Sequence, residues 1–172
     1  MVQLLTLLSA VGAVIAAMGA FLSSRATRKA AEAELFSNFM EDYGGAEMRE
    51  AMDALTDWRS KHKSAWKADF KAALAADDAD ALAVNNARRL LKYYFLKALR
   101  LHDAGYVTKW FLRQVCNVDG INILYDTVEP LDLIANPNER QSQLHRLQQI
   151  CPRYGQGYTK QAEATGTYER SA

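Results

Sequence analysis

The stretch that decides the fold is DALAVNNARRLLKYYFLKALRLHDA, residues 80–104. Its apolar residues recur at alternating spacings of three and four, at Val84, Ala87, Leu91, Tyr94, Ala98 and Leu101. Residues with this spacing share one side of an α-helix, so the pattern predicts a long helix with a seam for packing other helices. Acidic residues precede it and Gly105 follows, which are typical start and stop signals. Further apolar positions widen the seam and predict that this helix is central to its domain.

The other side of the predicted helix is basic and carries the candidate surface for a partner or for lipid: Arg89, Lys92, Leu96, Lys97 and Arg100. Residues 88–113 hold seven Lys/Arg and one acid, whereas residues 119–132 hold four acids and no base. With a net charge of only +1, pairing of these two segments within the fold is favoured over a groove for nucleic acid. Nucleic acid is therefore not a predicted partner. The sequence leaves open whether the basic face contacts lipid, another protein or acidic residues of the same chain.

The sequence around this helix also indicates helices. Helical spacing predicts helices over residues 46–59 and from Ser64 onward, and Thr108 is a suitable N-cap for another that ends near Cys116. A short helix from Ile121 should stop at Pro130, and Asn136 to Glu139 predicts a capped start for the last helix. Because no segment alternates apolar and polar residues as strands do, we expect an all-α domain of about six helices over residues 44–154. Residues 155–172 have no apolar periodicity and should be disordered.

The N-terminal segment predicts a membrane anchor. Residues 1–24 have no charged side chain, and residues 4–22, LLTLLSAVGAVIAAMGAFL, can span the roughly 30 Å hydrocarbon layer as a helix. A cleaved signal peptide would carry basic residues before the apolar run, and a buried core helix would usually be shorter. Here Arg25, Arg28 and Lys29 follow the run, which predicts an N-terminus outside and a cytoplasmic domain at the bacterial inner membrane. Residues 25–43, rich in Ala, Glu, Arg and Lys, should continue the helix as a juxtamembrane stalk.

Small residues form a stripe within the predicted anchor. They are Ser9, Gly12, Ala16, Gly19 and Ala20. Small residues at spacing four let membrane helices approach closely, so this stripe is a candidate site for packing against another membrane helix, from a second copy or a different protein. The alternative is that Ala and Gly are simply frequent in membrane helices.

The sequence contains no recognised catalytic, cofactor-binding or metal-binding motif, so we expect no enzyme activity, no cofactor and no metal. The one speculative cluster would bring together His102, Asp103, Cys116, His145 and Cys151 across packed helices. Isolated His and Cys residues on helices are far more often structural. We interpret the two cysteines as buried, reduced residues in a cytoplasmic domain; a periplasmic domain would make a disulfide between them plausible.

From residue 90 to residue 130 the sequence reads LLKYYFLKALRLHDAGYVTKWFLRQVCNVDGINILYDTVEP. Together with the N-terminal span, this stretch resembles bacterial single-span, membrane-anchored helical proteins of unknown function, which have an aromatic-rich helix, a glycine break and a second helix. Leu96 and Lys97 stand where those proteins would have an acidic residue. The resemblance implies a membrane-tethered helical fold and no particular activity.

Two functions are consistent with the sequence. The first is a non-enzymatic accessory or scaffold subunit that docks onto a membrane protein complex through its membrane helix and its cytoplasmic helical domain. The second is a membrane-tethered regulatory or sensing domain that binds a soluble partner or ligand between its helices.

Overall fold

The computed structural model describes residues 2–137 and 142–155, with side chains from residue 18 onward except that of Ser142. These residues form α1 (Val2–Gly44), α2 (Ala46–His62), α3 (Trp66–Ala75), α4 (Ala79–Asp103), α5 (Lys109–Val115), α6 (Gly120–Ile123), α7 (Glu129–Ala135) and α8 (Ser142–Ile150). A 3₁₀ turn, Lys63–Ala65, precedes α3, and a π-helical turn, Leu124–Val128, lies between α6 and α7. No strand occurs within the described ranges, and the predicted all-α class is confirmed there.

The chain divides into two compact units, residues 1–39 and residues 40–172. The first unit consists of the greater part of α1, and the second begins with the last turn of that helix. The predicted continuation of the N-terminal helix to the Gly44-Gly45 pair is confirmed, because α1 extends from Val2 to Gly44. Within the described part of the chain, no helix has both the length and the apolar character needed to cross a membrane. The membrane anchor at residues 1–24 thus stays a prediction.

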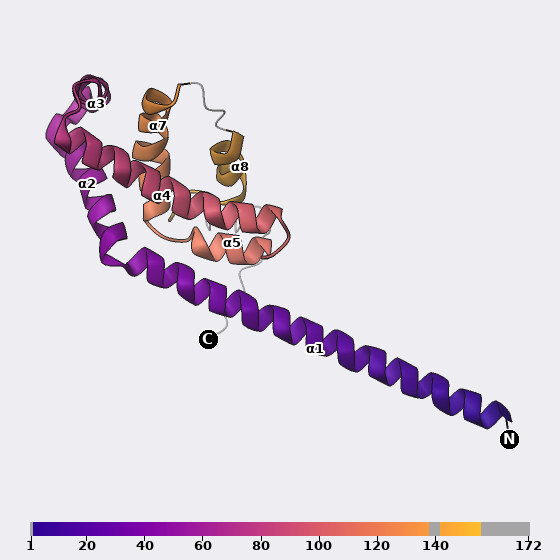
Figure 1. Ribbon diagram of the computed structural model, residues 1–172. Helices are drawn as coiled ribbons and strands as arrows, with labels where there is room; N and C mark the ends of the chain where they lie inside the picture. Colours follow the sequence, from indigo (N-terminus) through magenta and orange to yellow (C-terminus); the bar gives the residue numbers. More distant parts are fainter. Residues whose placement is uncertain (1, 138–141, 156–172) are drawn as a thin grey trace. The chain divides into compact units, whose positions relative to one another are not determined.

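Helix α4 is the central element of the second unit, as its sequence predicts. It contacts α2, α3, α5, α7 and α8, and α2 packs against it most extensively. Figure 1 shows α5 lying alongside α4. The seam residues point into the core, where Leu91, Phe95 and Leu99 are almost completely buried. Burial of side chains of this size stabilises the fold by roughly 1.5–3 kcal/mol each, so this face supplies much of the stability of the unit.

Two helix starts are fixed by the side chains that their sequences suggested. Asp78 precedes α4 and accepts a hydrogen bond from the Ala81 amide at 3.0 Å. Thr108 precedes α5 and accepts one from the Phe111 amide at 3.2 Å. Each bond satisfies a backbone N–H that the first turn of a helix leaves without a partner. The predicted N-cap at Thr108 is confirmed.

The predicted helix stop at Pro130 is wrong. The helical path continues from α6 through the π-helical turn, and Pro130 sits in the first turn of α7. A proline lacks the N–H that would bond to the carbonyl four residues earlier, so an ordinary helix is disfavoured at this point. A π turn changes the hydrogen-bond spacing just before Pro130, and the chain keeps its helical direction.

Two further expectations fall wholly or partly outside the described residues. The capping box expected at Asn136–Glu139 extends beyond residue 137, and the last described helix begins at Ser142. The tail expected to be disordered, residues 155–172, is described only at Gly155. The expectation about the remaining tail residues stays a prediction.

Candidate functional site

A cleft in the described part of the second unit follows the basic side of α4. It has a volume of about 850 Å³, and α4 forms one wall, with Leu74 of α3, Asp132 and Ala135 of α7, and Glu47 of α2 completing it. Its lining includes four basic side chains and two acidic ones, an excess of positive charge. We call it the α4 cleft.

The floor of the α4 cleft is a buried ion-pair cluster centred on Asp132. This carboxylate is 1 % exposed and accepts hydrogen bonds from Arg88, which is 2 % exposed, and from Lys92 Nζ at 2.6 Å. Asn136 Nδ2 donates to the same carboxylate at 3.3 Å. The Arg88 guanidinium also donates twice to Asn85 Oδ1, at 3.1 and 2.8 Å. The cluster is therefore well satisfied, as a buried charge must be to avoid a large desolvation cost.

The rim of the α4 cleft carries the charge that the floor does not neutralise. Arg89 and Arg100 are exposed, and Arg89 makes no ion pair among the described residues. Among the described residues, Arg100 contacts the neutral amide of Gln143, with its Nη2 at 3.4 Å from Oε1, and no carboxylate. Between the two arginines lie Tyr93, which is 59 % exposed, and Leu96, which is 4 % exposed. The α4 cleft thus has two cationic ends joined by an apolar strip.

Four of the five residues predicted as a partner or lipid surface line this cleft: Arg89, Lys92, Leu96 and Arg100. The fifth, Lys97, is outside its lining and has its Nζ at 3.6 Å from Asp42 Oδ2. Successive helical residues are separated by about 100°, so Lys97 lies roughly 60–80° around the helix from Arg89 and Arg100, on the flank of their stripe. The expected pairing of the basic and acidic segments is confirmed for Arg88 and Lys92, both of which bind Asp132.

The buried role of Arg88 was not predicted from the sequence. The charge blocks pointed to pairing but could not say which arginine of the Arg88-Arg89 pair turns inward. Helical phase was the available signal, because Arg88 lies four residues before Lys92 and three before the core residue Leu91. Tyr93 stands between Lys92 and Tyr94 in the sequence, on the basic side of α4, and is 59 % exposed.

A second cleft of about 470 Å³ lies along the π-helical turn. Two of its three charged side chains have protein partners: Arg59 Nη1 is 3.4 Å from Thr127 Oγ1, and Asp126 Oδ1 is 2.6 Å from Arg153 Nη1. π turns occur often at functional sites, but these contacts are also sufficient to explain the side chains here. The α4 cleft is the stronger candidate because its rim arginines lack an acidic partner in the described chain.

The two cysteines are free and buried, in agreement with their interpretation as apolar core residues. Burial raises the pKa of the Cys116 thiol well above its ordinary value, and the neighbouring Cys151 thiol raises it further. The Cys151 thiol in turn points at the Leu112 carbonyl oxygen, with a distance of 3.8 Å. A raised pKa keeps a thiol protonated and unreactive near neutral pH.

The speculative cluster of histidines and cysteines does not form a metal site. His102 Nδ1 lies 3.3 Å from the Val107 carbonyl oxygen, Asp103 pairs with Arg146, and His145 contacts Gln149 on its own helix. Across the described residues, no group of three or more His, Cys, Asp or Glu side chains is placed to hold a metal ion.

The last turn of α1 is linked to the start of α6 within the second unit. The Tyr43 hydroxyl donates to the Asp119 carboxylate and accepts from the Gly120 amide at 2.9 Å. A Cβ at Gly120 would lie 2.9 Å from this hydroxyl, so a larger residue cannot fit without displacing the ring. Burial raises the pKa of Tyr43, and the hydrogen bond to Asp119 raises it further.

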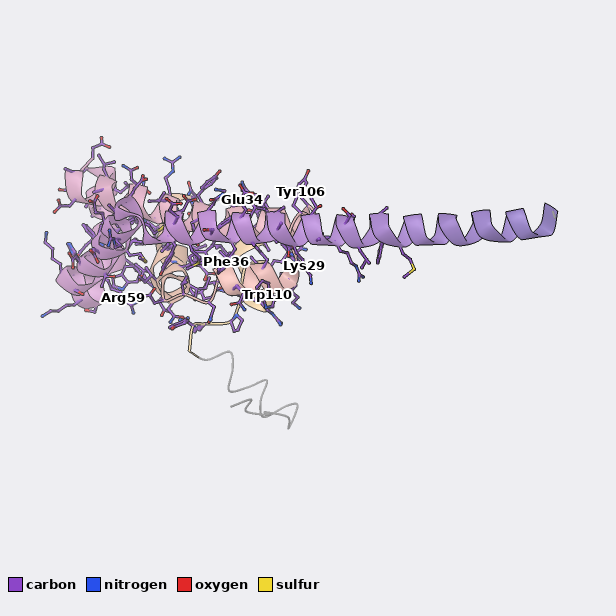
Figure 2. The ribbon with its side chains drawn as sticks, turned by 90° about the horizontal axis from the view of Figure 1, so that it is seen from below. Lys29, Glu34, Phe36, Arg59, Tyr106 and Trp110 are labelled. Carbon is purple, nitrogen blue, oxygen red and sulfur yellow. The ribbon has the colours of Figure 1, made fainter. Side chains whose placement is uncertain are left out.

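The residues predicted to set the membrane topology, Arg25, Arg28 and Lys29, are exposed on α1. Figure 2 labels Lys29 on this helix. The Arg25 guanidinium lies over the Phe21 ring, 4.5 Å from its centroid. Of the small-residue stripe, Gly19 and Ala20 are exposed, and a Cβ at Gly19 would meet nothing within 4 Å.

The other stripe members, Ser9, Gly12 and Ala16, belong to the part of α1 whose side chains are outside the described set. The predicted packing surface is therefore described only at its C-terminal end.

Two aromatic side chains near the start of α5 are exposed to solvent. Tyr106 is 69 % exposed and Trp110 is 64 % exposed, and both are labelled in Figure 2. The basic residues Lys109 and Arg113 on the same short helix are also exposed. Although Trp110 has a large apolar ring, the structure leaves it outside the core.

The comparisons give no relative from which a function could be carried over. Searches against protein-family models, curated proteins and solved structures find no match to this chain. The resemblance to bacterial single-span helical proteins therefore stays a prediction, and the function must be argued from the α4 cleft and the sequence.

Proposed function

We propose that this chain is a non-enzymatic, single-span membrane protein that serves as an accessory or scaffold subunit of a membrane protein complex. The observation that carries the docking role is the α4 cleft, where two exposed arginines flank an apolar strip and have no acidic partner among the described residues. Unneutralised charge beside apolar surface is typical of a site that another molecule covers.

Membrane attachment is the second part of this proposal. The uncharged residues 1–24 form the anchor, and Arg25, Arg28 and Lys29 keep the following domain in the cytoplasm of a bacterial cell. The exposed Tyr106 and Trp110 support a location close to lipid, because Tyr and Trp are favoured at the membrane–water interface. The stripe of Ser9, Gly12, Ala16, Gly19 and Ala20 packs against a membrane helix of the partner or of a second copy.

The docking role is tested by purification of the full chain from membranes in mild detergent. We expect a membrane protein to co-purify in a fixed ratio, and we expect Arg89→Glu with Arg100→Glu to release it. The control is Lys71→Glu, which reverses the charge of an exposed residue on α3 outside the cleft. Retention of the same partner by the double variant would exclude the α4 cleft as the docking surface.

The membrane topology is tested separately with reporters fused after Ala172. We expect activity from a reporter that works only in the cytoplasm and none from one that works only in the periplasm. Periplasmic activity would contradict the orientation, and recovery of the chain in the soluble fraction would contradict the anchor itself.

A second candidate function is a membrane-tethered sensing domain that binds a small ligand. The volume of the α4 cleft, about 850 Å³, is the observation that favours it, because small-molecule sites commonly measure about 300–1,000 Å³. The two functions differ in one requirement: a scaffold has a protein partner in fixed ratio, whereas a sensor can be isolated without one.

A further inference from the structure

The spacing of the two rim arginines restricts what the α4 cleft can bind. Arg89 and Arg100 are eleven residues apart on one helix, which places their backbones about 16 Å from each other. A single phosphate or carboxylate group is far too small to contact both. An occupant that uses both cations must therefore carry two negative groups separated by a similar length.

The surface between the arginines is suited to apolar contact. Tyr93 is 59 % exposed, and Leu74 and Leu90 of the cleft lining are partly exposed, whereas Leu96 is almost completely buried beneath them. Exposed aromatic and aliphatic surface beside arginine is the usual composition of a protein-binding hot spot. A purely hydrophilic polyanion would leave this strip without a matching contact.

The secondary structure around the cleft selects between an extended and a helical occupant. The elements that supply its lining are helices, whose interior N–H and C=O groups already bond within each helix. An extended peptide would find no sheet edge with which to share its backbone groups. An α-helix satisfies its own backbone and needs only side-chain contacts, so it is the better match.

The cluster on the floor explains why the rim charges remain available. Arg88 and Lys92 both bind Asp132, so the one acidic residue at the base of the cleft is already occupied by two cations. The other acid of the lining, Glu47, comes from α2 and forms no ion pair with either rim arginine in the described part of the chain. The rim therefore keeps a positive field directed at an incoming partner.

From these observations we propose that the α4 cleft binds an acidic amphipathic helix of a partner protein. Acidic side chains about eleven residues apart on that helix pair with Arg89 and Arg100, and apolar side chains between them pack on the exposed Tyr93 and the partly exposed Leu90. This inference depends on the proposed docking function and specifies the chemistry of the docking segment.

The test uses a fluorescein-labelled helical peptide about 18 residues long, with two Glu eleven positions apart and Leu on the same face between them. Its matched control has Gln in place of both Glu. Binding to the purified full chain in mild detergent is followed by fluorescence anisotropy. We expect the Glu peptide to bind at least about tenfold more tightly than the Gln peptide, with affinity falling as salt increases.

Protein variants identify the surface that the peptide uses. Arg89→Ser with Arg100→Ser should weaken binding by about tenfold, whereas Arg113→Ser, an exposed arginine on α5, should leave it unchanged. Arg89→Lys with Arg100→Lys keeps the charges and should retain most of the affinity. Far-ultraviolet circular dichroism establishes that each variant is folded.

Several outcomes would overturn the inference. They are equal binding of the Glu and Gln peptides, equal loss with Arg113→Ser, complete competition by millimolar inorganic phosphate, or tighter binding of a single-stranded oligonucleotide than of the Glu peptide. Failure of this test with continued co-purification of a membrane partner would reject the acidic helix and leave the docking function in place. Recovery of the chain in the soluble fraction, or periplasmic reporter activity, would contradict the proposed function regardless of the result with the peptide.

Discussion

The two sides of α4 have different roles: one packs into the core, and the other lines the α4 cleft. On the core side, Leu91, Phe95 and Leu99 are buried against the surrounding helices. On the cleft side, Arg89 and Tyr93 are exposed, and only the floor of the cleft is closed by an ion-pair cluster. The difference indicates that one helix provides both the stability of the unit and its candidate binding surface, in separate stripes.

Adjacent residues illustrate this separation. Arg88 is buried and has its charge matched by Asp132, whereas Arg89 is exposed and has no ion pair among the described residues. A rotation of about 100° along the helix separates a structural arginine from one available for binding. Substitutions on the two sides should therefore affect different measurements.

The largest expected effect is on the core side. Phe95→Ala removes a side chain with no exposed surface and leaves a cavity, so it should lower the free energy of unfolding by about 3–5 kcal/mol. Denaturant unfolding followed by the fluorescence of the buried Trp58 and Trp66 measures this loss. Tyr93→Ala, on the exposed side of the same helix, is the control and should cost far less. Equal losses would contradict the assignment of the two sides.

A somewhat smaller effect is expected at the floor of the cleft. Asp132→Asn leaves Arg88 and Lys92 without their shared negative charge and should cost about 3 kcal/mol, the low end of the range for breaking a buried pair, because the amide oxygen still accepts a hydrogen bond. The same unfolding measurement applies. The triple variant Arg88→Met, Lys92→Met and Asp132→Leu removes all three charges and should recover much of the stability. No recovery would mean that the cluster stabilises the fold through more than charge balance.

Alkaline pH should destabilise the core side through Tyr94. Burial, followed by the neighbouring Cys116, raises the pKa of this phenol above its ordinary value of about 10, so the folded protein keeps a proton that the unfolded chain releases. The stabilisation is complete below about pH 10 and declines as the pH rises beyond it, by up to about 1.4 kcal/mol per pH unit for one such group. Tyr43, Tyr125 and Cys116, whose pKa values are also raised by burial, should add to the decline.

Unfolding curves measured from about pH 8 to about pH 11 test this expectation. Tyr94→Phe removes one titrating group and should make the decline less steep. A decline of unchanged steepness would show that Tyr94 is not the group responsible.

The smallest stability effect is expected at the rim of the cleft. Arg89→Ser removes an exposed side chain with no ion pair in the described chain, so the free energy of unfolding should change by no more than about 0.5 kcal/mol. Binding of the Glu peptide should nevertheless decrease. A large stability loss would show that Arg89 belongs to the structure in the same way as Arg88.

The sequence was sufficient to predict much of this fold. The bounds of α4, its central position and the N-cap at Thr108 follow from local patterns, and the structure contains each of them. The predicted stop at Pro130 failed, because the π-helical turn lets a proline stand where an α-helix would be interrupted. Local rules describe the ordinary helix well but do not say when tertiary packing favours another hydrogen-bond spacing.

The candidate site was predictable only in part. The basic stripe was visible in the sequence, and four of its five members line the α4 cleft. Lys97 is directed elsewhere, toward Asp42, and the exposure of Trp110 could not be inferred from its apolar character. An apolar residue stays outside the core when no neighbouring helix covers its side of the helix. The number of sides that are covered depends on tertiary packing.

The sequence alone determined the all-helical class, the long central helix and the concentration of positive charge on one of its sides, because helical periodicity depends only on residue spacing. Tertiary structure decided that α7 brings Asp132 beneath Arg88 and Lys92, and that Arg89 and Arg100 stay at the rim. Asp132 is forty residues beyond Lys92 in the chain, and no local interaction specifies which distant carboxylate meets which base. The packing of α7 against α3 and α4 brings Asp132 to Arg88 and Lys92. It thereby separates the paired charges of the floor from the rim charges that are available to a partner.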